Sequence, residues 1–186
     1  MTSALAMTMA ESGPRRLVAT WPERAVLADA TRVMIRPIEP GDAPHLQAGL
    51  LELSERTRYL RFHGPRSELS AEELRFLTEV DGENHFALVA FTLPRRRLVG
   101  VGRFIRLASA PEDAELALVV VDDLQGKGLG EMLLLRLRDA ASERGVARFT
   151  GSIIDDNRPM RALLRKHGGR VGLPSRGVCN IELALP

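Results

Sequence analysis

Apolar residues alternate with polar ones in some segments of this chain and recur every three or four residues in others, which predicts strands and helices respectively. Near the N-terminus, two alternating runs at 24–28 and 32–38 flank a short turn and predict a hairpin. Leucines at helical spacing follow Asp42, which is a suitable N-cap, and so predict a helix. A further short helix is expected after Ser70, because Ser-Ala-Glu-Glu is the sequence of a capping box.

The second half of the chain switches repeatedly between the two periods. A three-strand meander is expected first, then a long helix whose leucines form one apolar stripe, and then a strand, a helix and a last strand. The expected elements are strands at 85–93, 97–107 and 114–121, a helix at 128–143, a strand at 147–154, a helix at 157–167 and a strand at 178–185. Residues 1–23 show no period and are expected to form a flexible tail ahead of a single domain over 24–186.

The turn at 125–130, which reads Gln-Gly-Lys-Gly-Leu-Gly, joins the wholly apolar segment 116–121 to a strong helix former. The first N–H groups of a helix have no backbone partner, and the helix dipole adds roughly half a positive charge there. Glycines let the backbone approach a phosphate, because they carry no Cβ and adopt positive φ. Strand, glycine turn and helix in this order predict a site for a phosphorylated ligand. A turn that only packs the helix against the strand is the alternative.

The glycine spacing fits neither of two common phosphate loops. A dinucleotide loop needs G-x-G-x-x-G, and a nucleotide-triphosphate loop needs G-x-x-x-x-G-K followed by Ser or Thr. Instead, Gln125, Gly128 and Gly130 resemble the Q/R-x-x-G-x-G/A signature of the GNAT superfamily of N-acetyltransferases. In that family this turn holds the pyrophosphate of acetyl-coenzyme A (acetyl-CoA).

Three other segments resemble the acetyltransferase domain of bacterial protein-lysine acetyltransferases. They are VLADATRVMIRPIEPGDAPHL at 26–46, RTRYLRFHGP at 56–65 and DNRPM at 156–160. The resemblance implies an α/β (α+β) protein with the GNAT fold, a central mixed and mostly antiparallel sheet flanked by helices. It also implies transfer of an acetyl group from acetyl-CoA to a primary amine, with lysine side chains of proteins as the leading acceptors. A small-molecule amine is the second acceptor class, and a module that senses acyl-CoA without turnover is the third reading.

The resemblance also implies which residues would hold acetyl-CoA. Backbone groups of three valines would face the pantetheine arm, and the whole glycine turn would wrap the pyrophosphate. The implied residues are Val119, Val120, Val121, Gln125, Gly126, Lys127, Gly128, Leu129 and Gly130. Asn157 matches the asparagine that opens a helix in this family and contacts the cofactor arm. Asn157 is also a suitable N-cap ahead of Pro159, and the two roles are compatible.

Acetyl transfer requires the acceptor amine as a free base. A lysine with a pKa of about 10.4 is about 99.9% protonated near neutral pH, so a general base is the main side-chain requirement. Glu115 is the candidate, because alternation places it on one strand face with Ala117 and Val119, which would desolvate its carboxylate. A glutamate at this strand position is the base in the resembling family. A solvated strand-end glutamate after a polar turn at 111–113 is the alternative.

Two positions depart from the family pattern. Many GNAT enzymes carry a tyrosine seven residues after the helix-opening asparagine, as the general acid for the leaving thiolate, but here that residue is Leu164. Gly169 likewise stands where a phenylalanine is usual. A thiol with a pKa of about 8.5 leaves readily, so water can protonate the thiolate and no general acid is named.

Composition limits the remaining classes. The chain has 186 residues, 45% of them hydrophobic and 27% charged, which suits one globular domain. The net charge of +2, from 26 basic and 24 acidic residues, is too balanced to predict a nucleic-acid or anionic membrane surface. No apolar run approaches the length of a membrane span, and the N-terminus lacks the features of a secretion signal, so a cytoplasmic location is expected.

The remaining reactive side chains indicate no second chemistry. The four histidines lack metal-ligand spacing, so no metal is expected, and Cys179 is expected to be a packed thiol. The arginines at 95–97 are expected in a solvated hairpin turn. Those at 56, 58 and 61 flank Tyr59 in the segment that shapes the acceptor groove of the resembling family, where they would meet an acidic substrate or form packing contacts and ion pairs. No oligomeric state follows from these patterns, and a dimer is one option.

Overall fold

The computed structural model describes residues 20–186, so most of the predicted tail at 1–23 lies outside the described residues. The strands are β1 (Glu23–Val26), β2 (Arg32–Pro37), β3 (His85–Thr92), β4 (Leu98–Leu107), β5 (Ala110–Val120), β6 (Arg148–Ile154), β7 (Arg170–Val171) and β8 (Val178–Ala184). The helices are α1 (Ala43–Glu52), α2 (Glu55–Phe62), α3 (Ala71–Thr78), α4 (Leu129–Glu143) and α5 (Arg158–Lys166). Two short 3-10 turns, η1 (Pro40–Asp42) and η2 (Asp122–Leu124), precede α1 and the glycine turn.

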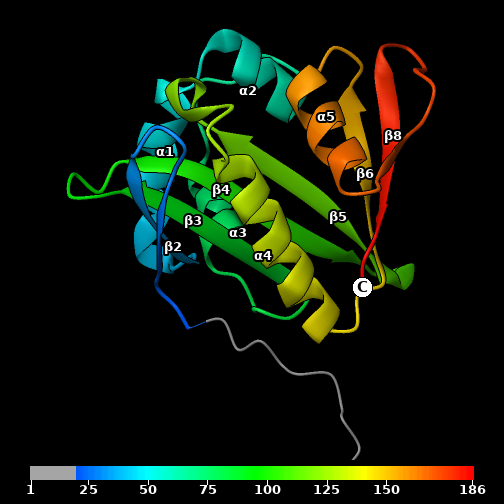
Figure 1. The fold of residues 1–186 in the computed structure, drawn as a ribbon, viewed down its shortest axis with the longest axis horizontal. Helices are drawn as coiled ribbons and strands as arrows, with labels where there is room; N and C mark the ends of the chain where they lie inside the picture. The colour runs from blue at the N-terminus through cyan, green and yellow to red at the C-terminus, as the bar shows by residue number, and fades with distance from the viewer. Residues whose placement is uncertain (1–19) are drawn as a thin grey trace, which may run out of the picture.

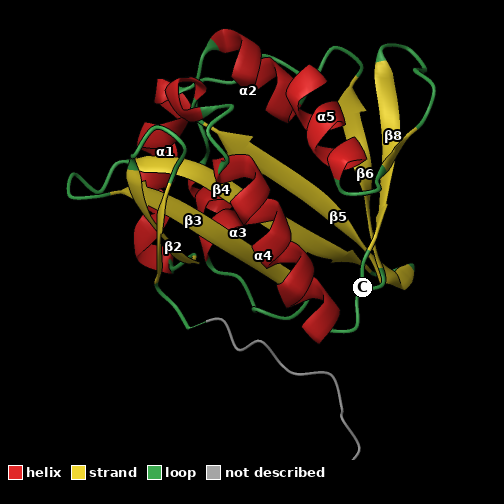
Figure 2. Ribbon diagram, viewed as in Figure 1, coloured by secondary structure: helices red, strands yellow, loops and turns green. Residues whose placement is uncertain are grey.

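The strands form one sheet in the order β1-β2-β3-β4-β5-β6-β8-β7 (Figure 2). Neighbouring strands are antiparallel except for β5 and β6, which run parallel. These two strands can run parallel because α4 connects them, and this crossover brings the chain back to the end of the sheet where β5 began. The mixed, mostly antiparallel sheet predicted for this chain is confirmed.

The sheet opens in its middle, between β5 and β6. These strands are in register only over 113–115 and 148–150, and beyond that point they separate (Figure 1). β5 stays paired with β4 along its length, whereas β6 pairs with β8. One edge of segment 116–120 therefore has no strand partner among residues 20–186.

Helices cover both faces of the sheet. α4 packs on β3, β4 and β5, while α1 and α3 lie on the opposite face (Figure 1). The predicted stripe of α4 is confirmed, because Leu133 and Leu137 are fully buried. They approach the sheet so closely that a Cβ added at Gly100 would lie 3.0 Å from Leu133, and one at Gly102 would lie 2.8 Å from Leu137. Within 20–186, no helix combines the length and apolar character needed to cross a bilayer.

Of the two predicted helix N-caps, Ser70 caps its helix with its side chain and Asp42 does not. The capping box at Ser70 is confirmed, because its hydroxyl accepts from the Glu73 N–H (3.2 Å) and the Glu73 carboxylate accepts from the Ser70 N–H (2.8 Å). Asp42 precedes α1 but does not cap it with its side chain. Its carboxylate accepts two bonds from the Arg36 guanidinium (2.8 and 2.7 Å) and one from the Glu39 N–H (2.9 Å) instead.

Two strand predictions need correction. β5 begins at Ala110, so residues 111–113 belong to the strand and not to a turn. The chain reverses at 108–109 instead. β4 and β5 remain paired up to Leu107 and Ala110, with a register shift between Arg106 and Leu107. β7 was not predicted, because two residues are too few to show a period.

Candidate functional site

A cavity of about 680 Å³ lies where β5 and β6 separate. Five segments far apart in the chain form its walls: α2, β5, the glycine turn, β6 and α5. Its size falls within the range of sites that hold small organic ligands and cofactors. The polar side chains in the walls include Thr57, Arg61, His63, Glu115, Gln125, Ser152 and Asn157.

The glycine turn at one end of this cavity presents backbone donors to open space. Gly126 and Gly128 have φ values of 71° and 95°, which glycine adopts without strain. A Cβ at either position would meet no atom within 4 Å. The N–H groups of 126–130 have no acceptor among residues 20–186, and the positive end of the α4 dipole adds to their charge. These are the features that a phosphate group needs.

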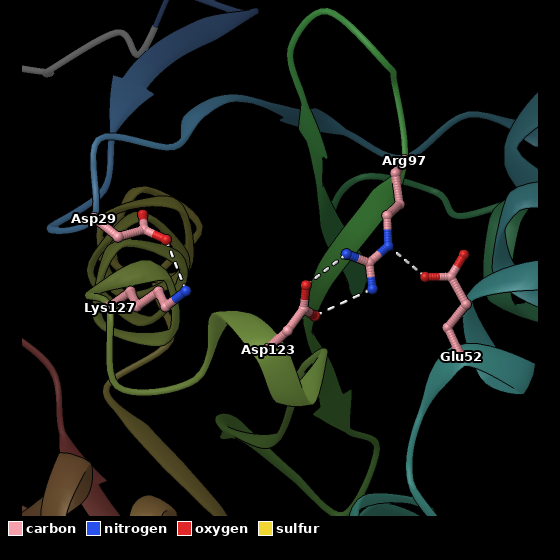
Figure 3. A network of polar contacts seen from close by, with 5 residues as sticks. All are labelled: Asp29, Glu52, Arg97, Asp123 and Lys127. Atoms are coloured by element: carbon pink, nitrogen blue, oxygen red, sulfur yellow. Dashed lines mark hydrogen bonds and ion pairs between the residues drawn. The ribbon is translucent and has the colours of Figure 1, made fainter.

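Ion pairs support the turn from two sides (Figure 3). Lys127 Nζ lies 2.7 Å from Asp29 Oδ2 in the β1–β2 hairpin. Arg97 donates both Nη groups to Asp123, at 2.8 and 3.1 Å, and its Nε to Glu52. The hydrogen bond from Lys127 lowers the pKa of Asp29 to about 2, and that from Arg97 lowers the pKa of Asp123, so both acids are ionised at neutral pH. Arg97, which was expected in a solvated turn, thus pairs with carboxylates of α1 and η2.

A second polar network joins the turn to α2. Gln125 Nε2 donates to the carbonyl of Val120 (3.0 Å) on the open edge of β5 and to the Thr57 hydroxyl (3.3 Å). That hydroxyl donates to the Asp122 carboxylate (2.7 Å), which also accepts from the N–H (2.9 Å) and hydroxyl (2.6 Å) of Ser54. Ser54 is the N-cap of α2, so these bonds fix the helix as a wall of the cavity.

Asn157 occupies the position where α5 begins. Its Oδ1 accepts from the N–H of Met160 at 3.2 Å, which confirms that it is the N-cap. The same residue lines the cavity. Capping therefore holds the amide side chain where a ligand in the cavity would contact it.

Glu115 lines the cavity at the point where the sheet begins to open. Its register partners are Ile105 in β4 and Thr150 in β6, and this pair with Thr150 is the last before the gap. The residue is exposed, so the expected desolvation by Ala117 and Val119 is not present. The gap between β5 and β6 admits solvent to the carboxylate, because Ala117 and Val119 lie on only one side of it. This exposure fits the alternative of a solvated glutamate, but no turn precedes Glu115 directly, because β5 begins five residues earlier.

The other residues implied by the resemblance divide into two groups. Val119, Val120, Gln125, Gly126, Gly128, Gly130 and Asn157 line the cavity. The side chain of Lys127 turns to Asp29, Leu129 is fully buried beneath Gly100, and Val121 lines a second, smaller cavity. For Lys127 and Leu129, backbone groups alone are left for contact with a ligand in the large cavity.

The backbone groups of the three valines do not all face the gap between β5 and β6. The N–H of Val121 donates to the carbonyl of Val99 in β4 at 3.0 Å. Hydrogen-bonded pairs alternate along an antiparallel ladder, so Val119 is bonded to its β4 partner Val101 in the same way. Val120, between them, directs its backbone to the gap, as its bond from Gln125 shows. Of the three, only Val120 has backbone groups on the open edge.

No other tyrosine takes the place of the missing one. Leu164 is fully buried, and Tyr59, which is the only tyrosine in the sequence, is 49% exposed on α2 and does not line the cavity. The fold explains why residue 169 is glycine and not the usual phenylalanine, because a Cβ there would lie 2.9 Å from the carbonyl oxygen of Leu164. His63 and Ser152 were not predicted as wall residues, since no motif or period distinguishes them in a single sequence.

Comparison with known proteins connects this geometry to a family. The family model described as "Acetyltransferase (GNAT) domain" matches residues 32–170. Acetyltransferase Pat of Mycolicibacterium smegmatis is 34% identical over 152 residues, which are 82% of this chain and 45% of that protein. Acetyltransferase PA5475 of Pseudomonas aeruginosa is 32% identical over 139 residues, 74% of each chain. The chain thus spans less than half the length of Pat.

Solved structures agree with the sequence matches. The crystal structure of the GNAT domain of S. lividans PAT superposes with a TM-score of 0.82 at 28% identity and covers 90% of this chain and 98% of that one. The cAMP-binding acyltransferase from Mycobacterium smegmatis gives a TM-score of 0.64 at 28% identity, over 89% of this chain and 47% of that chain. The match to the first structure extends over nearly the whole of both chains.

Proposed function

Because the chain belongs to the GNAT acetyltransferase family, whose members are N-acetyltransferases that use acetyl-CoA, we propose that it acetylates a primary amine with Glu115 as the general base. The observation that carries this proposal is a single cavity that has the free amides of 126–130 at one end and the carboxylate of Glu115 in its wall. The amides suit the pyrophosphate of the co-substrate, and the carboxylate suits the proton of the acceptor.

The open edge of β5 would hold the middle of acetyl-CoA. With the pyrophosphate on the glycine turn, the pantetheine arm runs along 116–120 toward Glu115. Its amides can pair with backbone groups on that edge, which have no strand partner among residues 20–186. Asn157 contacts the arm from the opposite wall, at the start of α5.

The chemistry then requires the acceptor nitrogen to lose two protons and to displace the thiolate from the carbonyl carbon. Glu115 accepts a proton from the acceptor ammonium, directly or through a water, which offsets a protonation penalty of roughly 4 kcal/mol for a lysine at neutral pH. The amine attacks the thioester carbonyl and forms the new C–N bond, the nitrogen releases its second proton to solvent, and the C–S bond breaks as the tetrahedral intermediate collapses to the amide. The thiolate takes its proton from water, because Leu164 supplies none.

For the acceptor, lysine side chains of proteins are the leading class. The support comes from the segments that resemble bacterial protein-lysine acetyltransferases and from the 34% identity to Pat. Small-molecule amines are the competing class, since the cavity alone does not distinguish a lysine side chain from a free alkylamine.

A thiol-release assay with acetyl-CoA, run over lysine peptides and small amines, tests the activity. Calorimetric titration of coenzyme A into the protein tests the binding site separately. We expect binding of coenzyme A and faster thiol release with lysine peptides than with small amines. Binding without release on either panel would indicate an acyl-CoA-sensing module, and the absence of binding would overturn the site itself.

A further inference from the structure

A second cavity of about 70 Å³ adjoins the large one, and Arg61, Phe62, Ala117 and Val119 line both. Its remaining walls are leucine and valine side chains on the α1 and α3 side of the sheet, together with one further charged residue, Arg103. An apolar cavity with two guanidinium groups in its wall is unusual, because charged side chains are seldom buried without a partner of opposite charge.

Arg103 is a buried cation whose partners are all neutral. It lies in β4 opposite Ala117 and is only 4% exposed. Its Nη1 donates to the carbonyl of Leu77 (3.2 Å) and contacts His85 Nε2 (2.9 Å). Its buried Nε has no hydrogen-bond partner among residues 20–186. The guanidinium therefore keeps an unused donor and has no carboxylate within ion-pair distance in that part of the chain.

His85 does not balance the charge. Burial, together with the adjacent Arg103, lowers the pKa of His85 to about 4, so the imidazole is neutral at pH 7 and accepts a hydrogen bond from the guanidinium. Burial, together with the nearby Arg61, lowers the pKa of Arg103 to about 9. Arg103 is thus still largely charged at neutral pH, in surroundings that do not compensate it.

Arg61 adds a second cation on the side of the large cavity. It extends from α2, is half-buried, and makes no ion pair within the described residues. Burial lowers its pKa, whereas the charge of Glu115 opposes that shift. Two guanidinium groups thus lie at the junction of the two cavities, the charge of Glu115 acts on Arg61, and neither arginine has an ion-pair partner among residues 20–186.

We propose that Arg61 and Arg103 bind a carboxylate carried by the acceptor substrate, in a position that directs its amine toward Glu115. This inference rests on the proposed function and specifies its substrate class. The cavity holds a carboxylate with a short apolar stem, which an amino acid provides directly and an acceptor peptide provides through an Asp or Glu side chain beside the lysine. A guanidinium fork matches a carboxylate in shape and charge.

Matched acceptors that differ only in the carboxylate test the proposal. One pair is 4-aminobutyrate and butylamine, and the other is a lysine peptide flanked by Glu and the same peptide flanked by Gln. We expect thiol release to favour the carboxylate member of at least one pair by about 10-fold to 100-fold in kcat/KM, as for a hydrogen bond to a charged group. The responding pair identifies the source of the carboxylate. Equal rates within both pairs would overturn the inference while leaving the acetyltransferase activity intact.

Arg103→Met gives the matched test at the residue. Methionine fills a similar space without a charge. We therefore expect the ratio of kcat/KM between the carboxylate acceptor and its neutral partner to fall toward one, while coenzyme A still binds. Arg75→Gln, an exposed arginine on α3, should keep the preference. Arg61→Gln is the second variant, should Arg103→Met fail to fold. A preference retained in the variant that folds would overturn the proposal.

Binding of 4-aminobutyrate and butylamine to the coenzyme A complex, followed by calorimetry, separates the two proposals. Tighter binding of 4-aminobutyrate that is lost in Arg103→Met supports the carboxylate site even if no thiol is released, in which case only the proposed reaction fails. Equal binding of the two amines contradicts the carboxylate site.

Discussion

Glu115 shows how a candidate base is positioned by strand register and not by burial. It stands at the last residue pair before β5 and β6 separate, with its side chain in the cavity and exposed to solvent. Solvent access allows a water to relay the proton, so the carboxylate need not touch the amine directly. Placement beside the opening is then its main contribution to the proposed reaction.

Replacing Glu115 by Gln should lower kcat by about 10²–10⁴, because the substituted amide keeps the size but cannot accept the proton. The affinity for coenzyme A should change little, since the amides that hold the pyrophosphate lie at the other end of the cavity. Glu112→Gln, an exposed glutamate on the same strand, is the control. Steady-state thiol release and calorimetry measure both quantities, and full activity in Glu115→Gln would remove Glu115 from the mechanism.

Asn157 combines a structural and a binding role in one amide, and two substitutions separate these roles. Asn157→Ala should destabilise the fold by about 1 kcal/mol through the lost cap and should also weaken coenzyme A binding. Asn157→Ser should keep the cap, because serine is equally suited to that position, but should still weaken binding. Urea unfolding and calorimetry give the two readouts. Undiminished affinity in both variants would limit Asn157 to capping.

At the scale of elements, the glycine turn depends on partners that are distant in sequence. The β1–β2 hairpin holds it through Asp29 and Lys127, and the connection between β3 and β4 holds the preceding η2 turn through Arg97 and Asp123. The turn is therefore preformed by the fold, with its amides already directed to the cavity. A preformed site loses little conformational entropy when a ligand binds.

Gly128→Ala tests whether the backbone conformation of the turn matters. A residue with a Cβ at a φ of 95° is strained, by about 1–3 kcal/mol, and should shift the turn and weaken coenzyme A binding by about tenfold or more. Gly41→Ala is the matched control, because a Cβ there also meets open space but Gly41 is not among the positive-φ glycines. Unchanged affinity in Gly128→Ala would show that the amides of 126–130 tolerate displacement.

Local patterns predicted the elements well and the contacts between them poorly. The capping box at Ser70 and the glycine turn depend on neighbouring residues, so a single sequence reveals them. The partners of Arg97 lie 45 and 26 residues away, and no local pattern encodes them. The exposure of Glu115, which we expected only as the alternative, depends on how far β6 diverges from β5 to pair with β8, and no local pattern encodes that divergence.

At the scale of the whole molecule, the buried His85 links stability to pH. Its folded-state pKa of about 4 lies below the ordinary histidine value of 6.5, so between these values the unfolded chain binds a proton that the folded chain does not. Stability should therefore fall as the pH falls from 6.5 to 4, by roughly 3 kcal/mol from this residue alone. Below pH 4 this contribution is fully lost.

Urea unfolding between pH 4 and pH 7 measures this effect. His85→Gln keeps an acceptor for Arg103 but does not titrate, so its stability should depend less steeply on pH than that of the native protein. His45→Gln, which removes an exposed histidine, should keep the native slope. Parallel slopes for the native protein and His85→Gln would contradict the assignment.

The gap between β5 and β6 places a sheet edge inside the molecule and not at its rim. Exposed sheet edges elsewhere invite pairing with foreign strands, but here residues of α2 and α5 form walls of the cavity at the opening. An extended thioester bound along this edge would bridge the two halves of the sheet. Amide protons at Leu118 and Val120 should then exchange with deuterium more slowly once coenzyme A is present. The ligand would occupy the place of an additional strand between β5 and β6.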